Sequence, residues 1–457
     1  MNPYSPYNPI FPIDLNSARQ SLRSGQTSAQ EILDQAAAIA QSGACRYAFM
    51  PRQAHSEAYA VPAPTAPDRP ESLLAGIPVS VKDLFDVAGQ VTMAGSTVLA
   101  GTPPAPADAI AVARLRKAGA VLVGRTNMVE FAFSDVGINP HYGTPVNPAD
   151  AATERIPGGS SSGAAVSVAT GAAWVGLGSD TGGSLRIPAA LCGIVGFKST
   201  ARLVPTTGAL PLSTSLDTVG ALTRSVRDAV TVHEILSART VHLAGKPLSS
   251  CRLAVERTRM QDGLSGPVAA AFEHCLRVLR QSGARIEEIA LGEIDELATI
   301  NATGGLSAAE SHAWHRKLLA EHAPQYDPRV AVRILRGARM RAADYIDLQA
   351  ARMAWIVRME ARLGPFDAVL SPTVPITAPP LASVLHDDDE FFRINSLLLR
   401  NTSVVNMLDG CAISLPCHWP GELPVGLMLW HTALRDDTLL DLALQAEAAL
   451  AQSIQKQ

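Results

Sequence analysis

The sequence predicts an α/β protein with a large buried core. Of its 457 residues, 47% are hydrophobic and 18% are charged, so the chain can bury a sizeable core and is not globally disordered. Residues 108–119 have the pattern of a helix, and the apolar run 120–124 (AVLVG) directly after it has the pattern of a buried strand. A helix followed at once by a strand indicates layered α/β architecture with some parallel strand pairing.

The N-terminal part is predicted to hold two amphipathic helices within residues 15–41, separated by Gly25. We expect Asn16 and Thr27 to be their N-caps, and Gln30 completes a capping-box pattern with Thr27. A connector rich in Pro and Ala then covers residues 61–70.

The next elements lead toward the glycine-rich centre of the chain. Residues 73–83 (LLAGIPVSVKD) form a β-rich run that ends in a lysine, and the helix over 108–119 is expected to begin at Asp108 and stop at Gly119. The uncharged stretch 163–178 is too short and too rich in small residues for a membrane span, so it predicts a buried helix that runs into a strand or loop.

The second half of the chain alternates between helical and strand-like segments. We expect a loop leading into a helix within 217–236, strands near 253–256 and 368–371, a long helical section over 266–361, apolar segments at 411–415 and 426–429, and a final helix to about residue 450. No repeat at a solenoid period is found, and no linker forces a domain split.

Charge and cysteine usage restrict the partners and the compartment. The formal net charge is −4 and the chain has no block of Lys and Arg, which argues against a nucleic-acid-binding surface. The six cysteines lie far apart without a CxxC pair, and the N-terminus lacks the features of a signal peptide. We therefore expect a reduced, cytoplasmic chain without a membrane span.

Two serine clusters carry the chemistry: GGSSSG at 158–163 and GSDTGGS at 178–184. Glycines beside a serine let backbone N–H groups approach a substrate carbonyl oxygen closely. The segment between the clusters is so apolar that it must be buried, which argues against two flexible surface loops.

Several nucleophile arrangements fit this region. GSSSG matches the nucleophile elbow G-x-S-x-G and would select Ser161, but the residues before it (NPADAATERIP) cannot form the strand that the elbow requires. A Ser-His-Asp triad stays open, with His141 the histidine near the clusters in sequence. Lys82 is a second candidate base, because burial at the end of an apolar run would lower its pKa from about 10.4 toward neutrality; by itself it also fits a strand-end lysine that reaches solvent.

The chain resembles the amidase signature family along most of its length. The similar segments are GIPVSVKD (76–83), TNMVEFAFS (126–134), PGGSSSGAAVSVATG (157–171) and LGSDTGGSLRIPAALCGIVGFKST (177–200), with NP at 147–148 and two segments of the tail. The resemblance implies one large α/β domain over 1–457, in which a mixed, twisted central sheet is covered by helices on both faces. Within it we expect a helical lead-in and connector (1–70), a catalytic core (71–235), a variable, mostly helical substrate-side region (236–365) and a C-terminal return to the core (366–457).

The resemblance assigns catalytic roles to three residues. Ser184 matches the acylating nucleophile, Ser160 matches the bridging serine that follows a cis peptide bond, and Lys82 matches the terminal base. Neutral Lys82 would take a proton from Ser160, which would take the proton of Ser184; the same relay would later protonate the leaving amine.

Further positions of the resemblance surround this relay. The N–H groups of Thr181, Gly182, Gly183 and Ser184 would hold the oxyanion. Other family positions place Ser161, Asp180 and Arg186 as supporting residues around the nucleophile loop, and Ala132 and Phe133 in the acyl pocket.

These features predict a hydrolase of an amide-type C–N bond in a small molecule: a carboxamide, an aryl amide, or a carbamate or urea-like linkage. We expect no cofactor and no metal; His312 and His315 share a helix face, but no further ligand cluster supports a zinc site. The expected partner is a small-molecule substrate, with no nucleic acid and no membrane, and a homodimer is allowed. The alternative is a glutaminase-type subunit of a tRNA-dependent amidotransferase, from whose usual sequence Ile187 departs.

Overall fold

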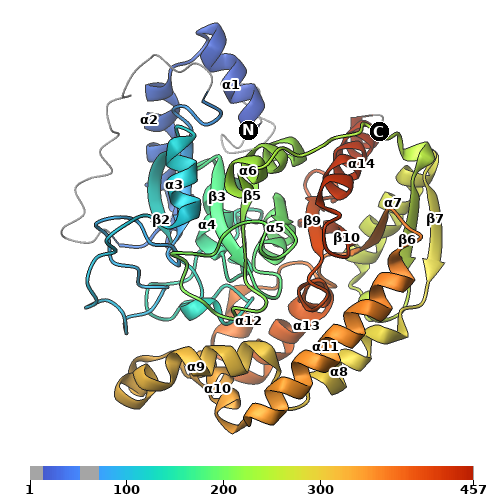
Figure 1. Cartoon of the computed structure of the whole chain (residues 1–457). Coiled ribbons are helices and arrows are strands. Elements are labelled where there is room, and N and C mark those ends of the chain that lie inside the picture. The colour runs from blue at the N-terminus through green and yellow to red at the C-terminus, as the bar shows by residue number, and fades with distance from the viewer. Residues whose placement is uncertain (1–13, 52–71, 456–457) are drawn as a thin grey trace.

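A ten-stranded mixed sheet forms the centre of the computed structural model, which describes residues 14–51 and 72–455 (Figure 1). The strand order along the sheet is β2-β1-β3-β5-β4-β9-β10-β8-β6-β7. The strands are β1 (Pro78–Lys82), β2 (Val121–Thr126), β3 (Val175–Asp180), β4 (Val195–Lys198), β5 (Thr218–Thr223), β6 (Arg252–Glu256), β7 (Arg285–Ile289), β8 (Ala368–Pro372), β9 (Cys411–Pro416) and β10 (Gly426–His431). Strands at both ends of the sheet pair in parallel, and those in the middle pair antiparallel.

Fourteen α-helices surround this sheet among the described residues. They are α1 (Leu15–Ser24), α2 (Ala29–Ala40), α3 (Ile110–Lys117), α4 (Ser162–Thr170), α5 (Arg186–Cys192), α6 (Val226–Ser237), α7 (Gly266–Gln281), α8 (Glu296–Ile300), α9 (Gly305–His322), α10 (Pro328–Leu335), α11 (Ala342–Leu363), α12 (Leu381–Leu385), α13 (Asp388–Met407) and α14 (Asp436–Gln455). The single domain with helices around a mixed sheet confirms the predicted fold class.

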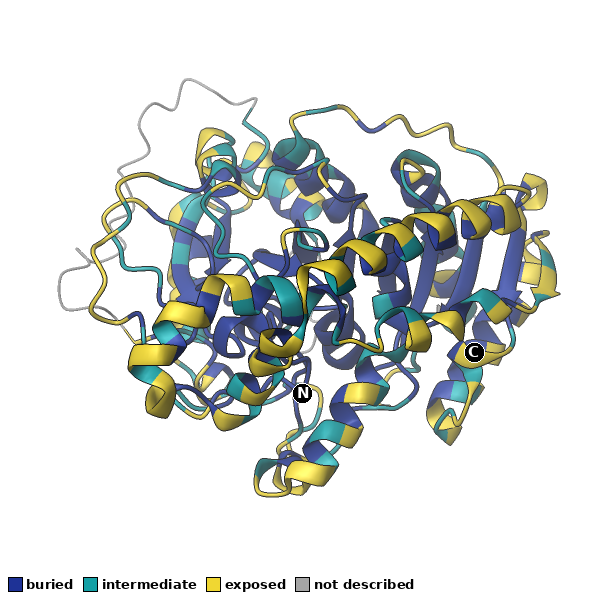
Figure 2. Cartoon of the chain, turned by 60° about the horizontal axis from the view of Figure 1, so that its bottom comes forward, coloured by how far each residue is buried: buried dark blue, intermediate teal, exposed yellow. Residues whose placement is uncertain are grey.

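Helices cover both faces of the sheet because successive side chains of a buried strand point to opposite faces. On β10, Leu427 and Leu429 join an apolar cluster with residues of α7 and α14. Met428 and Trp430, the alternate residues, join a cluster with residues of α11 and α13 instead. The strands inside the sheet are therefore buried on both sides, as the dark-blue strands of Figure 2 show.

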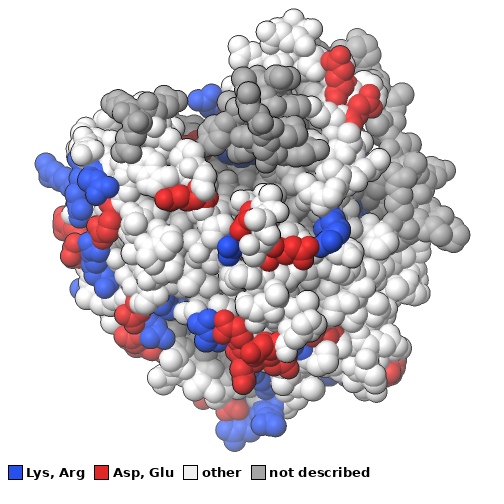
Figure 3. All heavy atoms as spheres, turned by 180° about the vertical axis from the view of Figure 1, so that it is seen from behind, with Lys and Arg blue, Asp and Glu red and all other residues white. Residues whose placement is uncertain are grey.

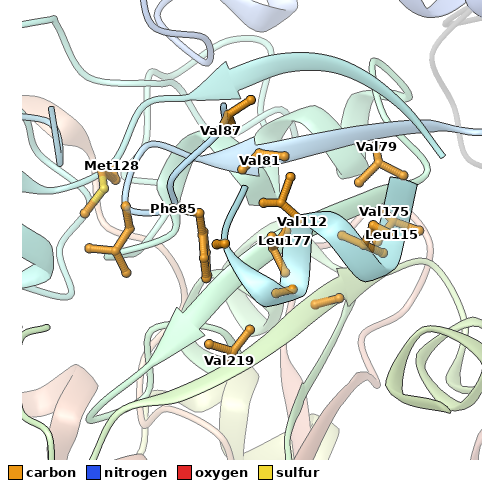
Figure 4. Packing of buried hydrophobic residues seen from close by; sticks show 14 of the residues in the cluster. Val79, Val81, Phe85, Val87, Val112, Leu115, Met128, Val175, Leu177 and Val219 are labelled. Atoms are coloured by element: carbon orange, nitrogen blue, oxygen red, sulfur yellow. The ribbon is translucent and has the colours of Figure 1, made fainter. Parts of the chain in front are cut away.

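The end of the sheet that carries the serine clusters is closed in the same way. Val79 and Val81 of β1 pack with Val112 and Leu115 of α3, and this cluster continues to β3 and β5 (Figure 4). On the opposite face, α4 and α5 pack over β5 and contact the neighbouring strands. The second glycine-rich loop thus follows a strand, β3, that is fixed from both faces, and the first leads directly into α4.

The two predicted N-terminal helices are confirmed as α1 and α2, but their predicted N-caps are wrong. Asp14, not Asn16, caps α1, because its side chain accepts the N–H of Ser17. Ser28, not Thr27, caps α2 and forms a capping box with Glu31 in place of Gln30.

The prediction of Asp108 as a helix cap is also wrong. The N-cap of α3 is Ala109, which makes no side-chain cap. Asp108 instead accepts the N–H of Ala88 and pairs with Arg116. The predicted connector at 61–70 lies outside the described residues.

Several elements were not predicted: β4, β5, β7, α5, α12 and α13. β5 replaces part of the loop that we expected at the start of 217–236, and it pairs antiparallel with β3. β7 interrupts the section expected to be helical; it is the last strand of the sheet, and its mostly exposed, charged residues (RIEEI) lack the apolar pattern of a buried strand.

Candidate active site

Lys82 is the last residue of β1, which is buried along its whole length between β2 and β3. The Lys82 side chain is itself fully buried. Because burial disfavours the ammonium form, it lowers the pKa of Lys82 to about 7, although the nearby carboxylates of Asp135 and Asp217 oppose this shift. A large share of Lys82 is therefore neutral at pH 7 and has a lone pair that can accept a proton.

Two serine hydroxyls surround the Lys82 amine. Nζ of Lys82 lies 2.8 Å from Oγ of Ser160 and 2.9 Å from Oγ of Ser179. The peptide bond between Gly159 and Ser160 is cis, the conformation that the resemblance implied. Two segments far apart in sequence, the end of β1 and the loop before α4, thus meet at one amine.

Ser184 lies on the tight loop 181–184 between β3 and α5. Gly183 has φ +146°, and a Cβ there would lie 2.3 Å from Oγ1 of Thr402, so this position requires glycine. Thr402 also fixes the loop, since its hydroxyl donates to the carbonyl oxygen of Gly182 at 2.6 Å. The N–H groups of Gly182, Gly183 and Ser184 donate to no other described residue, and they remain available to a substrate oxyanion.

The nucleophile candidate Ser184 contacts an aspartate that the sequence analysis did not identify. Oγ of Ser184 donates to Oδ1 of Asp135 at 3.0 Å. Burial raises the pKa of Asp135 to about 7, against the opposing effects of Arg333 and of the Ser184 hydroxyl. Among the described residues, no hydrogen bond joins the hydroxyls of Ser184 and Ser160, although the Ser161 N–H donates to the Ser184 carbonyl oxygen at 3.4 Å.

A buried ion pair between Arg186 and Asp180 joins the residues on either side of the loop 181–184. Arg186 donates through Nε and Nη2 to the two carboxylate oxygens of Asp180 at 3.0 and 2.9 Å. Burial by itself would raise the pKa of Asp180, but Arg186 outweighs it and the pKa falls to about 2. Asn406 completes the set, because it accepts from Arg186 at 2.7 Å and donates to Asp180 at 2.9 Å.

The remaining predicted residues lie around this centre. Thr181 donates through its hydroxyl to Asp217 at 2.5 Å, and Ser161 donates to the Ser179 carbonyl oxygen at 3.3 Å. Residues 147–157 contain no strand, so the structural context of a nucleophile elbow at Ser161 is missing.

A cavity of about 270 Å³ opens onto Ser184. Its lining includes the predicted pocket residues Ala132 and Phe133, together with Thr181 and Gly182 of the nucleophile loop. It also includes residues from the variable region, between Leu297 and Arg336. The cavity therefore joins the predicted reaction centre to residues of the region 236–365, which we expected on the substrate side without naming individual residues.

Three polar residues of the site escaped the sequence analysis: Ser179, Asp135 and Arg333. Ser179 stands inside the quoted motif GSDTGGS, so its position next to a predicted catalytic loop was a usable signal. Asp135 follows the quoted segment TNMVEFAFS directly, but only the fold brings it to Ser184. Arg333 lies in the region 236–365 that we expected on the substrate side, but only the fold shows that it contacts a ring 200 residues earlier in the chain.

Other features of the described residues bear on partners. On the face shown in Figure 3, acidic and basic groups alternate and no large patch of one sign is visible. None of the described helices combines the length and the apolar character needed to cross a membrane. His315 shares a hydrogen bond with the Tyr326 hydroxyl, and the described residues contain no group of three His, Cys, Asp or Glu side chains arranged to hold a metal ion.

Comparison with known proteins gives the family. A family model described as Amidase matches residues 28–440. The chain belongs to the amidase (amidase signature) family. This amidase-family chain is therefore an enzyme of a family whose members act on C–N bonds, as the sequence predicted.

Individual relatives show how varied this family is. The chain is 35% identical to 2-amino-5-chloromuconic acid deaminase of Comamonas testosteroni, over 83% of this chain and 82% of the relative. It is 33% identical to a glutamyl-tRNA(Gln) amidotransferase subunit of Symbiobacterium thermophilum, over 81% and 82%. A solved structure described as an amidase superposes with a TM-score of 0.85 at 34% identity, over 95% of this chain and 99% of that one.

Proposed function

We propose that this chain hydrolyses an amide-type C–N bond of a small molecule through an acyl-enzyme on Ser184. The observation that carries the proposal is the buried Lys82 amine, 2.8 Å from Ser160 and with a pKa of about 7. A lysine in this state is a competent base at neutral pH, and Ser160 is the hydroxyl through which it can act on Ser184.

The proposed acylation starts with a rotation of the Ser184 side chain away from Asp135 toward Ser160. The Ser184 oxygen then attacks the carbonyl carbon, its proton passes to Ser160, and the Ser160 proton passes to Lys82. The N–H groups of Gly182 and Gly183 would stabilise the negative oxygen that forms.

The relay then runs in reverse. Lys82 returns its proton through Ser160 to the leaving nitrogen, the C–N bond breaks, and an amine or ammonia departs. Water attacks the Ser184 ester by the same route and releases the acid. Each full cycle restores the starting protonation of the three residues, so no cofactor enters the balance.

The test is a panel of aliphatic amides, anilides, carbamates, ureas and glutamine, assayed for released amine or ammonia. Ser184→Ala should lower turnover by at least about 10⁴-fold, as loss of a nucleophile does in other serine hydrolases. The matched control is Ser162→Ala, which removes a buried hydroxyl of the first serine cluster that contacts the Asn127 carbonyl oxygen at 3.5 Å. Equal activity of the wild type and Ser184→Ala would refute the assignment.

The relative from Symbiobacterium thermophilum supports a second candidate, a glutaminase-type subunit of a tRNA-dependent amidotransferase. Glutamine as the preferred substrate, together with partner proteins that co-purify, would favour this candidate. Turnover of other amides by the isolated chain would favour the stand-alone hydrolase. For either function we propose a cytoplasmic location, since all six cysteines are buried free thiols.

A further inference from the structure

One side chain in the cavity next to Ser184 carries a charge without a counter-ion. Arg333 lies on α10, beside α9 at the bottom of Figure 1, and lines the cavity. Its Nη1 is buried without a hydrogen-bond partner, and no described carboxylate lies within 4.0 Å of its guanidinium. Its neighbour on the same helix, Arg329, shows the contrast, because it pairs with Asp388 and donates to two backbone carbonyls.

Neither of the groups that interact with Arg333, Phe133 and Asp135, forms a hydrogen bond or an ion pair with it. The guanidinium lies over the Phe133 ring, 4.8 Å from its centroid, which orients the group but leaves its N–H edge free. Burial lowers the pKa of Arg333 to about 10, so it remains charged at neutral pH. Asp135 acts on it electrostatically, but Asp135 accepts from Ser184 and forms no ion pair with Arg333. Arg333 is half-buried, and a charged group whose Nη1 is buried without a partner is costly unless a ligand supplies the anion.

A second arginine lines the same cavity. Arg336 follows Arg333 by three residues, at the start of the short helical turn Arg336–Arg339. Residues three apart in a helical segment lie on the same face, and both arginines line the cavity. Arg336 is also without an ion pair among the described residues, and it is exposed. The rest of this cavity's lining combines apolar side chains, for example Leu212, Leu216 and Leu306, with polar ones such as Asp135 and Asn301.

We propose that the substrate carries a carboxylate away from its scissile amide, bound by Arg333 with help from Arg336. The inference rests on the proposed amide hydrolysis and names its substrate class: the half-amide of a dicarboxylic acid. A guanidinium matches a carboxylate with two parallel hydrogen bonds. The apolar lining fits the short carbon chain between the two groups, and the volume of about 270 Å³ suits a small molecule.

The experiment compares a charged substrate with a neutral one of the same shape. 5-Amino-5-oxopentanoate and its methyl ketone counterpart 5-oxohexanamide differ only at the end remote from the amide; the half-amides of malonic, succinic and adipic acids vary the length. We expect at least one half-amide to have a kcat/KM about 30-fold above that of the neutral amide, the range for a charged hydrogen bond. Salt should reduce this preference. A neutral amide hydrolysed as well as every half-amide would overturn the proposal.

Variants of the arginines test whether Arg333 causes the preference for half-amides over the neutral amide. Arg333→Met should lower kcat/KM for the half-amide about 30-fold more than for the neutral amide, and Arg333→Lys should recover part of this preference. Arg339→Met is the matched control, since Arg339 is an exposed arginine of the same turn that does not line the cavity. An equal loss on both substrates in Arg333→Met would contradict the role, and the Arg333→Lys and Arg336→Met variants keep the test valid if Arg333→Met fails to fold.

A binding measurement separates this inference from the proposed function. Glutarate is titrated calorimetrically into Ser184→Ala, which cannot form an acyl-enzyme, and into the same variant with Arg333→Met. A Kd weakened about 30-fold by the second change would support the anion site even if no amide is hydrolysed. Glutarate binding that is undetectable at millimolar concentration, or unchanged by Arg333→Met, would overturn the site while amide turnover still supports the proposed function.

Discussion

The depressed pKa of Lys82 predicts a specific pH dependence. With a pKa of about 7, about 90% of Lys82 is neutral at pH 8 and about 10% at pH 6, whereas an ordinary lysine with a pKa near 10.4 would be less than about 1% neutral at pH 8. If neutral Lys82 is the base, kcat/KM should fall about tenfold for each pH unit below 7 and level off above pH 8. The lost activity returns when the pH is raised again.

Replacement of Asp135 tests the same pH dependence in a second way. Its carboxylate raises the pKa of Lys82, so Asp135→Asn should move the acidic limb of the profile to lower pH. The wild-type limb belongs to Lys82 and Asp135 together, because both titrate near pH 7, and the variant leaves a single step. Asp389→Asn removes an exposed carboxylate that does not act on Lys82 and serves as the control.

The assay is initial-rate hydrolysis from pH 5 to 10 at constant ionic strength, with the rate of Ser184 labelling by a fluorophosphonate as an independent readout. A limb centred above about pH 9 would mean that Lys82 is not the depressed base. A limb that stays in place in Asp135→Asn would mean that this carboxylate does not act on the base.

Three further predictions concern the nucleophile loop, the buried ion pair beside it, and the independence of the reaction from metal ions. Gly183→Ala places a Cβ within 2.3 Å of the Thr402 hydroxyl, so kcat/KM should fall at least about 100-fold; wild-type kinetics would contradict the fit of this loop. Arg186→Met leaves the Asp180 carboxylate buried without its cation, and urea unfolding should show a loss of about 3–5 kcal/mol; a change below about 1 kcal/mol would not agree with a buried pair. EDTA should leave turnover unchanged, and a loss that Zn²⁺ restores would overturn the cofactor-free mechanism.

The sequence was most informative where local pattern and chemistry coincide. The apolar run before Lys82 predicted a β-rich segment that ends at this lysine, and the burial of β1 in the structure explains the pKa that the mechanism needs. The uncharged stretch between the serine clusters predicted a buried helix that runs into a strand or loop, and the structure has α4 followed by β3, which carries the loop of Ser184. Both are properties of short segments, which periodicity and composition can report.

Contacts between distant segments could not be predicted in this way. Asp135 reaches Ser184 across 49 residues, and Arg333 reaches the Phe133 ring across 200. The N-cap of α2 was misplaced for a different, local reason. Thr27 and Ser28 are both good caps, and only the backbone geometry, in which Ser28 accepts the N–H of Glu31, decides between them.

The proposed mechanism depends on a covalent intermediate that forms on Ser184. Peptide mapping by mass spectrometry after reaction with a fluorophosphonate, or after rapid acid quench with a slow anilide substrate, locates the adduct directly. We expect a single adduct on the peptide that carries Ser184, formed more slowly below pH 7 and absent in Ser184→Ala. An adduct on Ser161, or one that persists in Ser184→Ala, would contradict it.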